Sequence, residues 1–98
     1  MMFTEEEKRI IISILILIME ADNVIHPKEV EFINEVFDDF GLSSAEYDHM
    51  EMIDFNLLKL QFDVFSAPKK QKAKEMFIKM AGVDGFIDYR EQKIIDEL

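Results

Sequence analysis

The feature that most restricts the fold is an apolar run near the N-terminus, Ile10 to Met19, which only Ser13 interrupts. A helix that is apolar on nearly every side is stable in water only when other elements surround it. The run is about half of the roughly 20 residues that a membrane-spanning helix needs. The sequence therefore predicts a buried central helix, which starts at a capping box of Thr4 and Glu7 and reaches about Ala21.

Cap signals and apolar residues at spacings of three and four predict four more helices. Their expected starts are Pro27, Ser43, Ser66 and Asp88, and Gly41 is expected to end the helix that starts at Pro27. Their apolar stripes are Val30, Ile33, Phe37 and Phe40; Tyr47, Met50, Ile53, Leu57 and Leu60; Ala73, Met76, Phe77, Met80 and Ala81; and Ile94, Ile95 and Leu98. The assignment of Gln61 to Phe65 stays open. We expect an all-α fold in a single domain, residues 1–98, built as a five-helix bundle with short loops.

Composition argues against several functional classes. The net charge is −10, and residues 1–66 carry 15 acidic and 4 basic side chains. Nucleic acids and anionic lipids are held mainly by Lys and Arg, so we expect neither as a partner and no membrane association. Cysteine is absent, which suits a reducing compartment, and three glutamates occupy the place of a basic signal-peptide start. The expected location is cytoplasmic, and no catalytic motif indicates an enzyme.

Two stretches of the chain match each other at a constant offset of 62 residues. Residues 21–33 read ADNVIHPKEVEFI, and residues 83–95 read VDGFIDYREQKII. The matching pairs are Asp22/Asp84, Ile25/Ile87, Glu29/Glu91 and Ile33/Ile95. Each copy covers a helix end, a turn and a new helix start. The repeat therefore predicts two pseudo-repeated helix-loop-helix hairpins joined by a middle helix.

Each turn resembles the back half of an EF-hand calcium loop. In the second copy, the fifth, sixth, ninth and twelfth loop positions are Asp84, Gly85, Asp88 and Glu91. Met80 and Gly82 occupy the first and third positions, so two carboxylates are missing. In the first copy Asp22 and Glu29 fit, Glu20 can take the third position, Ile18 fails at the first, and Asn23 replaces the glycine. Asn tolerates the left-handed conformation better than other residues, so the turn is retained.

Six acidic residues near these turns are candidate ligands for a divalent cation: Glu20, Asp22, Glu29, Asp84, Asp88 and Glu91. Calcium takes six to eight oxygens, and neither loop alone supplies them. If the loops pair, their carboxylates repel one another and a cation relieves the repulsion. Oxygen-only ligands favour Ca²⁺ or Mg²⁺, with a weak affinity of about 10⁻⁴ to 10⁻³ M for a single loop and a tighter one for a shared ion.

The same residues also have an explanation without metal. Glu29 and Glu91 fall at the third position of their helices, where a glutamate can bond back to the amide of the cap residue. Asp22 and Asp84 can accept backbone N–H bonds within the turns. Ile25 and Ile87 stand where EF-hand loops pair and fill the core, so both interpretations remain open.

With these two turns the sequence resembles the tellurite-resistance TerB family and the related domain of membrane-anchored DnaJ-type co-chaperones. The resemblance runs from about Glu5 to Leu98 and depends on the two short motifs. It implies an all-α fold with paired hairpins and an acidic metal-binding cluster, placed here on Asp22, Glu29, Asp84 and Glu91. Asn23, His26 and Pro27 depart from the family's pattern.

Two further groups of residues offer weaker candidate sites. Glu46 and His49 form an E-x-x-H pair of the kind found in di-iron bundles, but the sequence has no second copy, so an exposed pair is favoured. The lysines from Lys69 to Lys74 are interpreted as a solvated face that neutralises the acidic body, or as a face that docks an acidic protein.

These observations lead to two functional hypotheses. The first is a small acidic TerB-like module that binds a divalent cation at two paired acidic loops, with a role in stress or tellurite resistance. The alternative is a metal-free protein-protein interaction domain that uses its acidic face or its lysine-rich helix. Both expect another protein as partner, and the oligomeric state is open.

Overall fold

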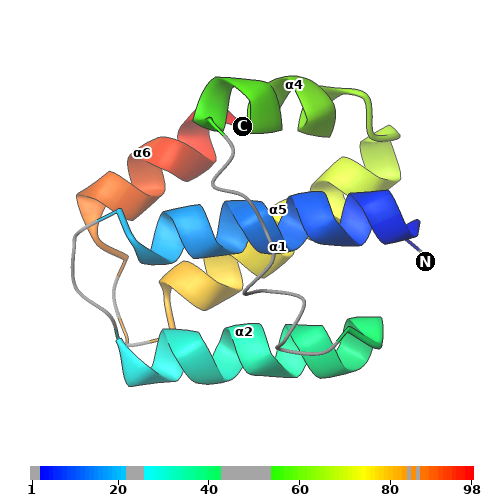
Figure 1. Ribbon diagram of the computed structural model, residues 1–98. Helices are drawn as coiled ribbons and strands as arrows, with labels where there is room; N and C mark the ends of the chain where they lie inside the picture. Colours follow the sequence, from blue (N-terminus) through cyan, green and yellow to red (C-terminus); the bar gives the residue numbers. More distant parts are fainter. Residues whose placement is uncertain (1–2, 22–25, 43–53, 84, 86) are drawn as a thin grey trace.

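The structure, a computed structural model, describes residues 3–21, 26–42, 54–83, 85 and 87–98. These residues form five α-helices and no strand (Figure 1). The helices are α1 (Glu5–Met19), α2 (Pro27–Phe40), α4 (Phe55–Asp63), α5 (Ala67–Ala81) and α6 (Tyr89–Glu97). The Cα radius of gyration is 12.4 Å, close to the value of about 13 Å for one domain of about 100 residues. The predicted all-α, single-domain fold is confirmed.

Helix α1 is the centre of the bundle. It packs against α2, α4, α5 and α6, and it crosses the middle of the molecule in Figure 1. Between residues 10 and 19 every side chain is buried except those of Ser13 and Leu17, which are half-buried. Within the described residues, no helix combines the length and the apolar character needed to cross a bilayer. The prediction that this run forms a buried central helix is confirmed.

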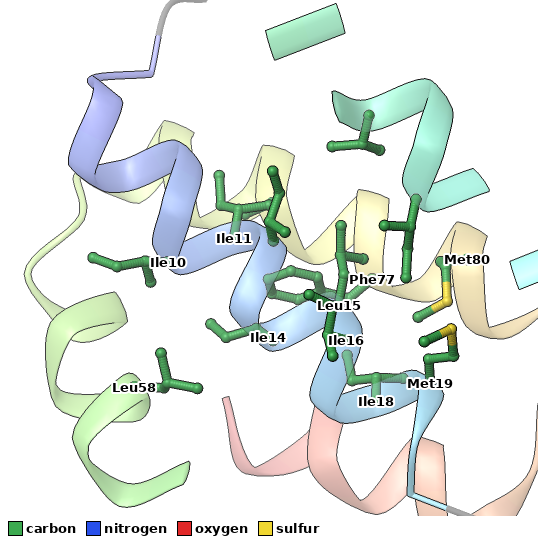
Figure 2. Packing of buried hydrophobic residues seen from close by; sticks show 14 of the residues in the cluster. Ile10, Ile11, Ile14, Leu15, Ile16, Ile18, Met19, Leu58, Phe77 and Met80 are labelled. Carbon is green, nitrogen blue, oxygen red and sulfur yellow. The ribbon is translucent and has the colours of Figure 1, made fainter. Parts of the chain in front are cut away.

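Neighbouring helices cover α1 from different sides. Figure 2 shows Ile14 on the side of α1 that faces Leu58 of α4, and Met19 on the side that faces Met80 of α5. Leu58 and Met80 are both fully buried. Removing an aliphatic side chain of this size from water contributes roughly 1.5–3 kcal/mol. The core therefore consists of α1 and the side chains that other helices place on it.

A series of aromatic rings connects the helices around α1. Phe3, which precedes α1, has its ring centroid 5.9 Å from that of Phe40 in α2 and 6.4 Å from that of Phe65. The centroid of Phe62 in α4 lies 5.1 Å from Phe65 and 5.7 Å from Phe77 in α5. Edge and tilted pairs add about 0.5–1.5 kcal/mol each beyond their burial. The series joins α2, α4 and α5 to the segment that precedes α1.

Cap residues set several of the helix ends as predicted. The backbone N–H of Thr4 donates to Glu7 Oε1 at 2.7 Å, and the N–H of Glu7 donates to Thr4 Oγ1 at 3.1 Å, which completes the capping box of α1. Helix α2 begins at Pro27 and ends at Gly41, whose φ of 71° is left-handed. A non-glycine residue is rarely stable there, so the predicted end of α2 is confirmed with its cause.

The predicted third helix is wrong at one point. It was expected to run without interruption from Ser43 to Leu60, but Asp54 has ψ of 138° and acts as the N-cap of α4, which starts at Phe55. The extended backbone at Asp54 ends any helical register that comes before it. Residues 43–53, which carry the rest of that prediction, lie outside the described residues. Helix α4 continues to Asp63 and so settles the open segment that begins at Gln61.

This break changes which apolar residues of α4 face the core. Leu57 and Leu60, expected on the apolar stripe of the third helix, are 48% and 65% exposed. Leu58 and Phe62 are buried instead, at 1% and 0%. A stripe extrapolated across Asp54 has the wrong phase, because the helical period restarts at Phe55. The side chains that fix α4 to α1 are therefore not those that periodicity alone selects.

The buried and exposed leucines of α4 provide a matched test. We expect Leu58→Ala to lower the free energy of unfolding by about 2–5 kcal/mol, because it leaves a cavity against α1. Leu57→Ala removes the same atoms from a half-exposed position and should cost less than about 1 kcal/mol. Urea unfolding followed by circular dichroism measures both. Equal losses would contradict the register of α4.

An ion pair joins the N-terminal ends of α1 and α5. Lys69 Nζ lies 2.8 Å from Glu7 Oε1. The hydrogen bond from Lys69, followed by the one from the Thr4 backbone, lowers the pKa of Glu7 below its ordinary 4.5. A carboxyl whose pKa falls on folding stabilises the folded state above its ordinary pKa, and this contribution is lost as the pH falls through the folded pKa.

We therefore expect Glu7→Gln to lower the free energy of unfolding at pH 7 by less than about 1 kcal/mol, since the pair is near the surface. The difference from the unchanged protein should shrink once the pH falls below 4.5 and vanish when Glu7 is protonated in both states. Urea unfolding at a series of pH values measures the difference. A difference that is independent of pH would assign the loss to the cap geometry and not to the charge.

Candidate functional site

The helix ends that flank the two acidic turns lie at the same end of the bundle. Figure 1 shows the C-terminal ends of α1 and α5 and the N-terminal ends of α2 and α6 at the end of the molecule opposite the N-terminus. The turns connect α1 to α2 and α5 to α6, and within each pair the helices pack against each other. Contacts of α1 with α6 and of α2 with α5 tie one pair to the other. The shared-ion hypothesis also requires the turns themselves to pair, and residues 22–25, 84 and 86 lie outside the described residues.

The described candidate ligands occupy two kinds of position. Glu20 is the exposed C-cap residue of α1, and Asp88 is the N-cap residue of α6. Glu29 and Glu91 are the third residues of α2 and α6, and they are only 1% and 3% exposed. Asp22 and Asp84, the other two predicted ligands, lie outside the described residues, so their positions stay predictions.

Glu29 and Glu91 are the unusual members of this group. They are the only charged residues that are buried in the described part of the chain. For Glu91, Oε2 is buried and has no hydrogen-bond partner there. Burying an ionised carboxylate costs free energy unless an opposite charge or several hydrogen bonds compensate. Glu91 thus lies in an environment in which a cation would be stabilising, and Glu29 shares its near-complete burial.

The capping role suggested for Glu91 is not formed. Asp88 accepts a hydrogen bond from the backbone N–H of Arg90 at 2.9 Å, and Arg90 Nε lies 3.8 Å from the same oxygen. Among the described residues Glu91 does not return a bond to the backbone of Asp88, so α6 has a single side-chain cap and not a capping box. The N-cap residue of α2, His26, also makes no side-chain cap bond. The metal-free explanation of Glu91 as a capping residue is therefore incorrect.

The backbone of the second turn has the conformation expected from its glycine. Gly85 has φ of 101°, which residues with a Cβ rarely adopt. Ile87 is half-buried and packs against the core. Its side chain lies 3.5 Å from the position that a Cβ on Gly82 would take. The turn glycine and the core-filling isoleucine of the second copy are thus in place, whereas Asn23 and Ile25 of the first copy lie outside the described residues.

A complete ligand set is not assembled by the described residues. No three His, Cys, Asp or Glu side chains in residues 3–21, 26–42, 54–83, 85 and 87–98 are grouped so that they could hold a metal ion. Two of the six predicted ligands, Asp22 and Asp84, are not among these residues. The described residues therefore bury Glu29 and Glu91 but do not bring three candidate ligands together, and the metal site stays a prediction.

The other candidates have different outcomes. Glu46 and His49 lie outside the described residues. In the lysine-rich segment, Lys69 pairs with Glu7, and Lys70 Nζ lies 3.5 Å from Asp63 Oδ1 in α4. These two lysines neutralise acidic residues of the body, as one of the two interpretations expected.

A feature that the apolar stripes do not predict is a groove of about 600 Å³ between α2 and α5, here called the α2–α5 groove. Its apolar floor is formed by Phe3, Phe32, Val36, Phe40 and Met76. The signal in the sequence is the row Phe32, Val36, Phe40 at spacings of four, beside the stripe that contains Ile33 and Phe37. Helix α2 therefore has a wider apolar surface than its core contact requires.

Comparison with known proteins gives one match. The family model of TerB, tellurite resistance protein TerB, matches residues 1–52. The matched part is just over half of the chain, and it includes the first acidic turn and Glu29 but not the second turn. Searches of curated proteins and of solved structures each found no match.

The unpartnered oxygen of Glu91 leads to a prediction without any metal. In the presence of EDTA, Glu91→Gln should raise the free energy of unfolding by about 1 kcal/mol or more, because the buried charge is removed while the shape is kept. Glu97→Gln, at an exposed position of the same helix, should change it by less than about 0.5 kcal/mol. Thermal and urea unfolding measure both variants. A clear loss of stability in Glu91→Gln would show that the carboxylate has a stabilising partner.

Proposed function

The chain belongs to the TerB family of tellurite resistance proteins, and we propose that it is a small module that binds a divalent cation at the end of the bundle that carries the helix ends flanking its two acidic turns. The observation that carries the proposal is the matched burial of Glu29 and Glu91, 1% and 3% exposed, with Glu91 Oε2 unpartnered among the described residues. An acidic chain with a net charge of −10 repels oxyanions such as tellurite, so the favoured ligand is a cation.

The proposed ligand set combines the two turns. Glu29 and Glu91 would supply buried carboxylates from the first turns of α2 and α6, and Glu20 and Asp88 would supply oxygens from the surface. Asp22 and Asp84 complete the set in the proposal. Carboxylate oxygens without nitrogen or sulfur ligands select hard ions, so Ca²⁺ or Mg²⁺ is proposed. Because each turn lacks ligands of a complete loop, the expected affinity is weak, about 10⁻⁴ to 10⁻³ M, unless both turns share one ion.

A thermal or urea unfolding titration tests this proposal. Starting from protein treated with EDTA, a cation that binds only the folded state should raise the free energy of unfolding by about 1.4 kcal/mol at tenfold excess over the dissociation constant and about 2.7 kcal/mol at hundredfold excess. Glu29→Gln and Glu91→Gln should each remove the response, whereas Glu97→Gln should keep it. Stability that does not change with millimolar Ca²⁺, Mg²⁺, Mn²⁺ or Zn²⁺ would refute the proposal.

A titration observed by NMR locates the ion. Backbone amides of residues 22–29 and 84–91 should shift together with one saturation curve if both turns hold the same ion. Amides at the far end of α2, near Phe40, serve as the internal control and should not move. Shifts confined to one turn would assign the ion to that turn alone.

A binding role without metal is the second proposal, and the α2–α5 groove favours it. Under this proposal the protein is a non-enzymatic interaction domain whose partner is another protein. The lysines first considered for docking are not equivalent, because Lys69 and Lys70 are already paired with acidic residues of α1 and α4. Lys72, which lines the groove and is exposed, is available to a partner.

A further inference from the structure

The α2–α5 groove has a length that suits a bound helix. Helix α2 contributes Phe32, Glu35, Val36, Asp39 and Phe40, which follow each other at the spacings of one helical face. Eight residues of helix rise about 12 Å, slightly more than two turns. The groove therefore runs along α2 for a length that matches two to three turns of a bound helix.

The floor of the groove is apolar and incompletely covered. Phe3, Phe32, Phe40 and Met76 are half-buried and pack against the core. Three aromatic rings and a methionine on one surface form an adaptable contact for aliphatic side chains. Their free sides face the groove, which they line.

The two walls of the groove have opposite charges. On α2, the acidic wall carries Glu35 and Asp39 and no base. On α5, the basic wall carries Lys72 and Lys79, with Glu75 between them. All five side chains are exposed, and in the described part of the chain no ion pair within 4.0 Å joins one wall to the other. The charges of the two walls are thus available to an occupant of the groove. Lys8 of α1, which also lines the groove, already donates to the Phe40 carbonyl at 3.0 Å and pairs with Glu5.

We propose that the α2–α5 groove binds an amphipathic helix of a partner protein, with an apolar stripe on the floor, a basic edge along α2 and an acidic edge along α5. This mode of recognition uses the side-chain spacing of helices on both sides. A simple anion or cation is a poorer occupant, because the opposite wall would repel it. The groove does not depend on the cation proposal, since Phe40 is the last residue of α2, and Figure 1 shows this end of α2 at the opposite end of the molecule from the N-terminal ends of α2 and α6.

Synthetic helical peptides test the proposal directly. The probe is a fluorescein-labelled peptide of about 14 residues, with Leu and Ile on one stripe, Glu on one edge and Lys on the other, a length of about 20 Å as a helix. The control peptide has the same composition with Glu and Lys mixed on both edges. Fluorescence anisotropy should show binding of the sorted peptide and about tenfold weaker binding of the mixed one. Binding should weaken as salt rises to about 1 M, where the Debye length is about 3 Å.

Charge variants of the protein provide the second arm. Lys72→Glu with Lys79→Glu makes both walls acidic and should weaken binding of the sorted peptide about tenfold. Adding Glu35→Lys and Asp39→Lys to that variant exchanges the walls and restores the original net charge of −10. Binding should then return, because a helix that docks in the reverse direction also exchanges its edges. Lys59→Glu with Lys93→Glu, outside the groove, is the matched control and should leave the affinity within about twofold.

Several results would overturn the proposal. These are no measurable binding of the sorted peptide at about 1 mM, equal binding of both peptides, and failure of the exchanged walls to restore binding in a variant whose melting curve is unchanged. Sedimentation measurements cover another occupant. Self-association that Lys72→Glu with Lys79→Glu abolishes would assign the groove to a second copy of this chain, and not to a partner helix.

Discussion

The burial of one helix on all sides is the constraint on which the rest of the structure depends. Helix α1 has too much apolar surface to leave any side in water, so every other described helix must contribute a covering face. This requirement explains why short helices such as α4 and α6 are stable at all, since each has few residues and a single apolar stripe. It also explains how the protein tolerates a net charge of −10. The apolar burial around α1 stabilises the fold, and this stabilisation offsets the repulsion among the acidic side chains at the surface.

Much of the fold could be predicted from local signals in the sequence. The capping box of Thr4 and Glu7 and the left-handed Gly41 are chemical requirements of helix ends, and the structure places both as expected. Periodicity failed where a single backbone angle matters. The sequence does not indicate that the backbone of Asp54 is extended, because aspartate occurs both at N-cap positions and on the exposed surface of helices. The pattern therefore predicts Leu57 and Leu60 in the core, whereas the structure buries Leu58 and Phe62 instead.

The candidate site was predictable in part. The repeat identified Glu29 and Glu91 as equivalent, and their nearly complete burial agrees with an equivalent environment. Burial itself could not be read from the sequence, because a glutamate at the third position of a helix is usually a solvated cap. The α2–α5 groove was harder to predict from the sequence than the burial of the glutamates. It depends on the relative placement of α2, α5 and Phe3, a tertiary property that no spacing within one helix reveals.

Phe3 belongs to two features at once. Its ring bridges Phe40 and Phe65 in the aromatic series and also forms part of the groove floor. The docking of the segment before α1 and the binding of a ligand in the groove therefore depend on the same ring. The two processes are coupled, and each one favours the other to the same extent. A ligand that contacts Phe3 stabilises the docked position of the segment before α1 and protects that segment from proteolysis. Fraying of that short segment, in turn, lowers the affinity of the groove. A large domain fused before Phe3 would therefore weaken binding in the groove, even though it contacts none of the charged residues on the groove walls.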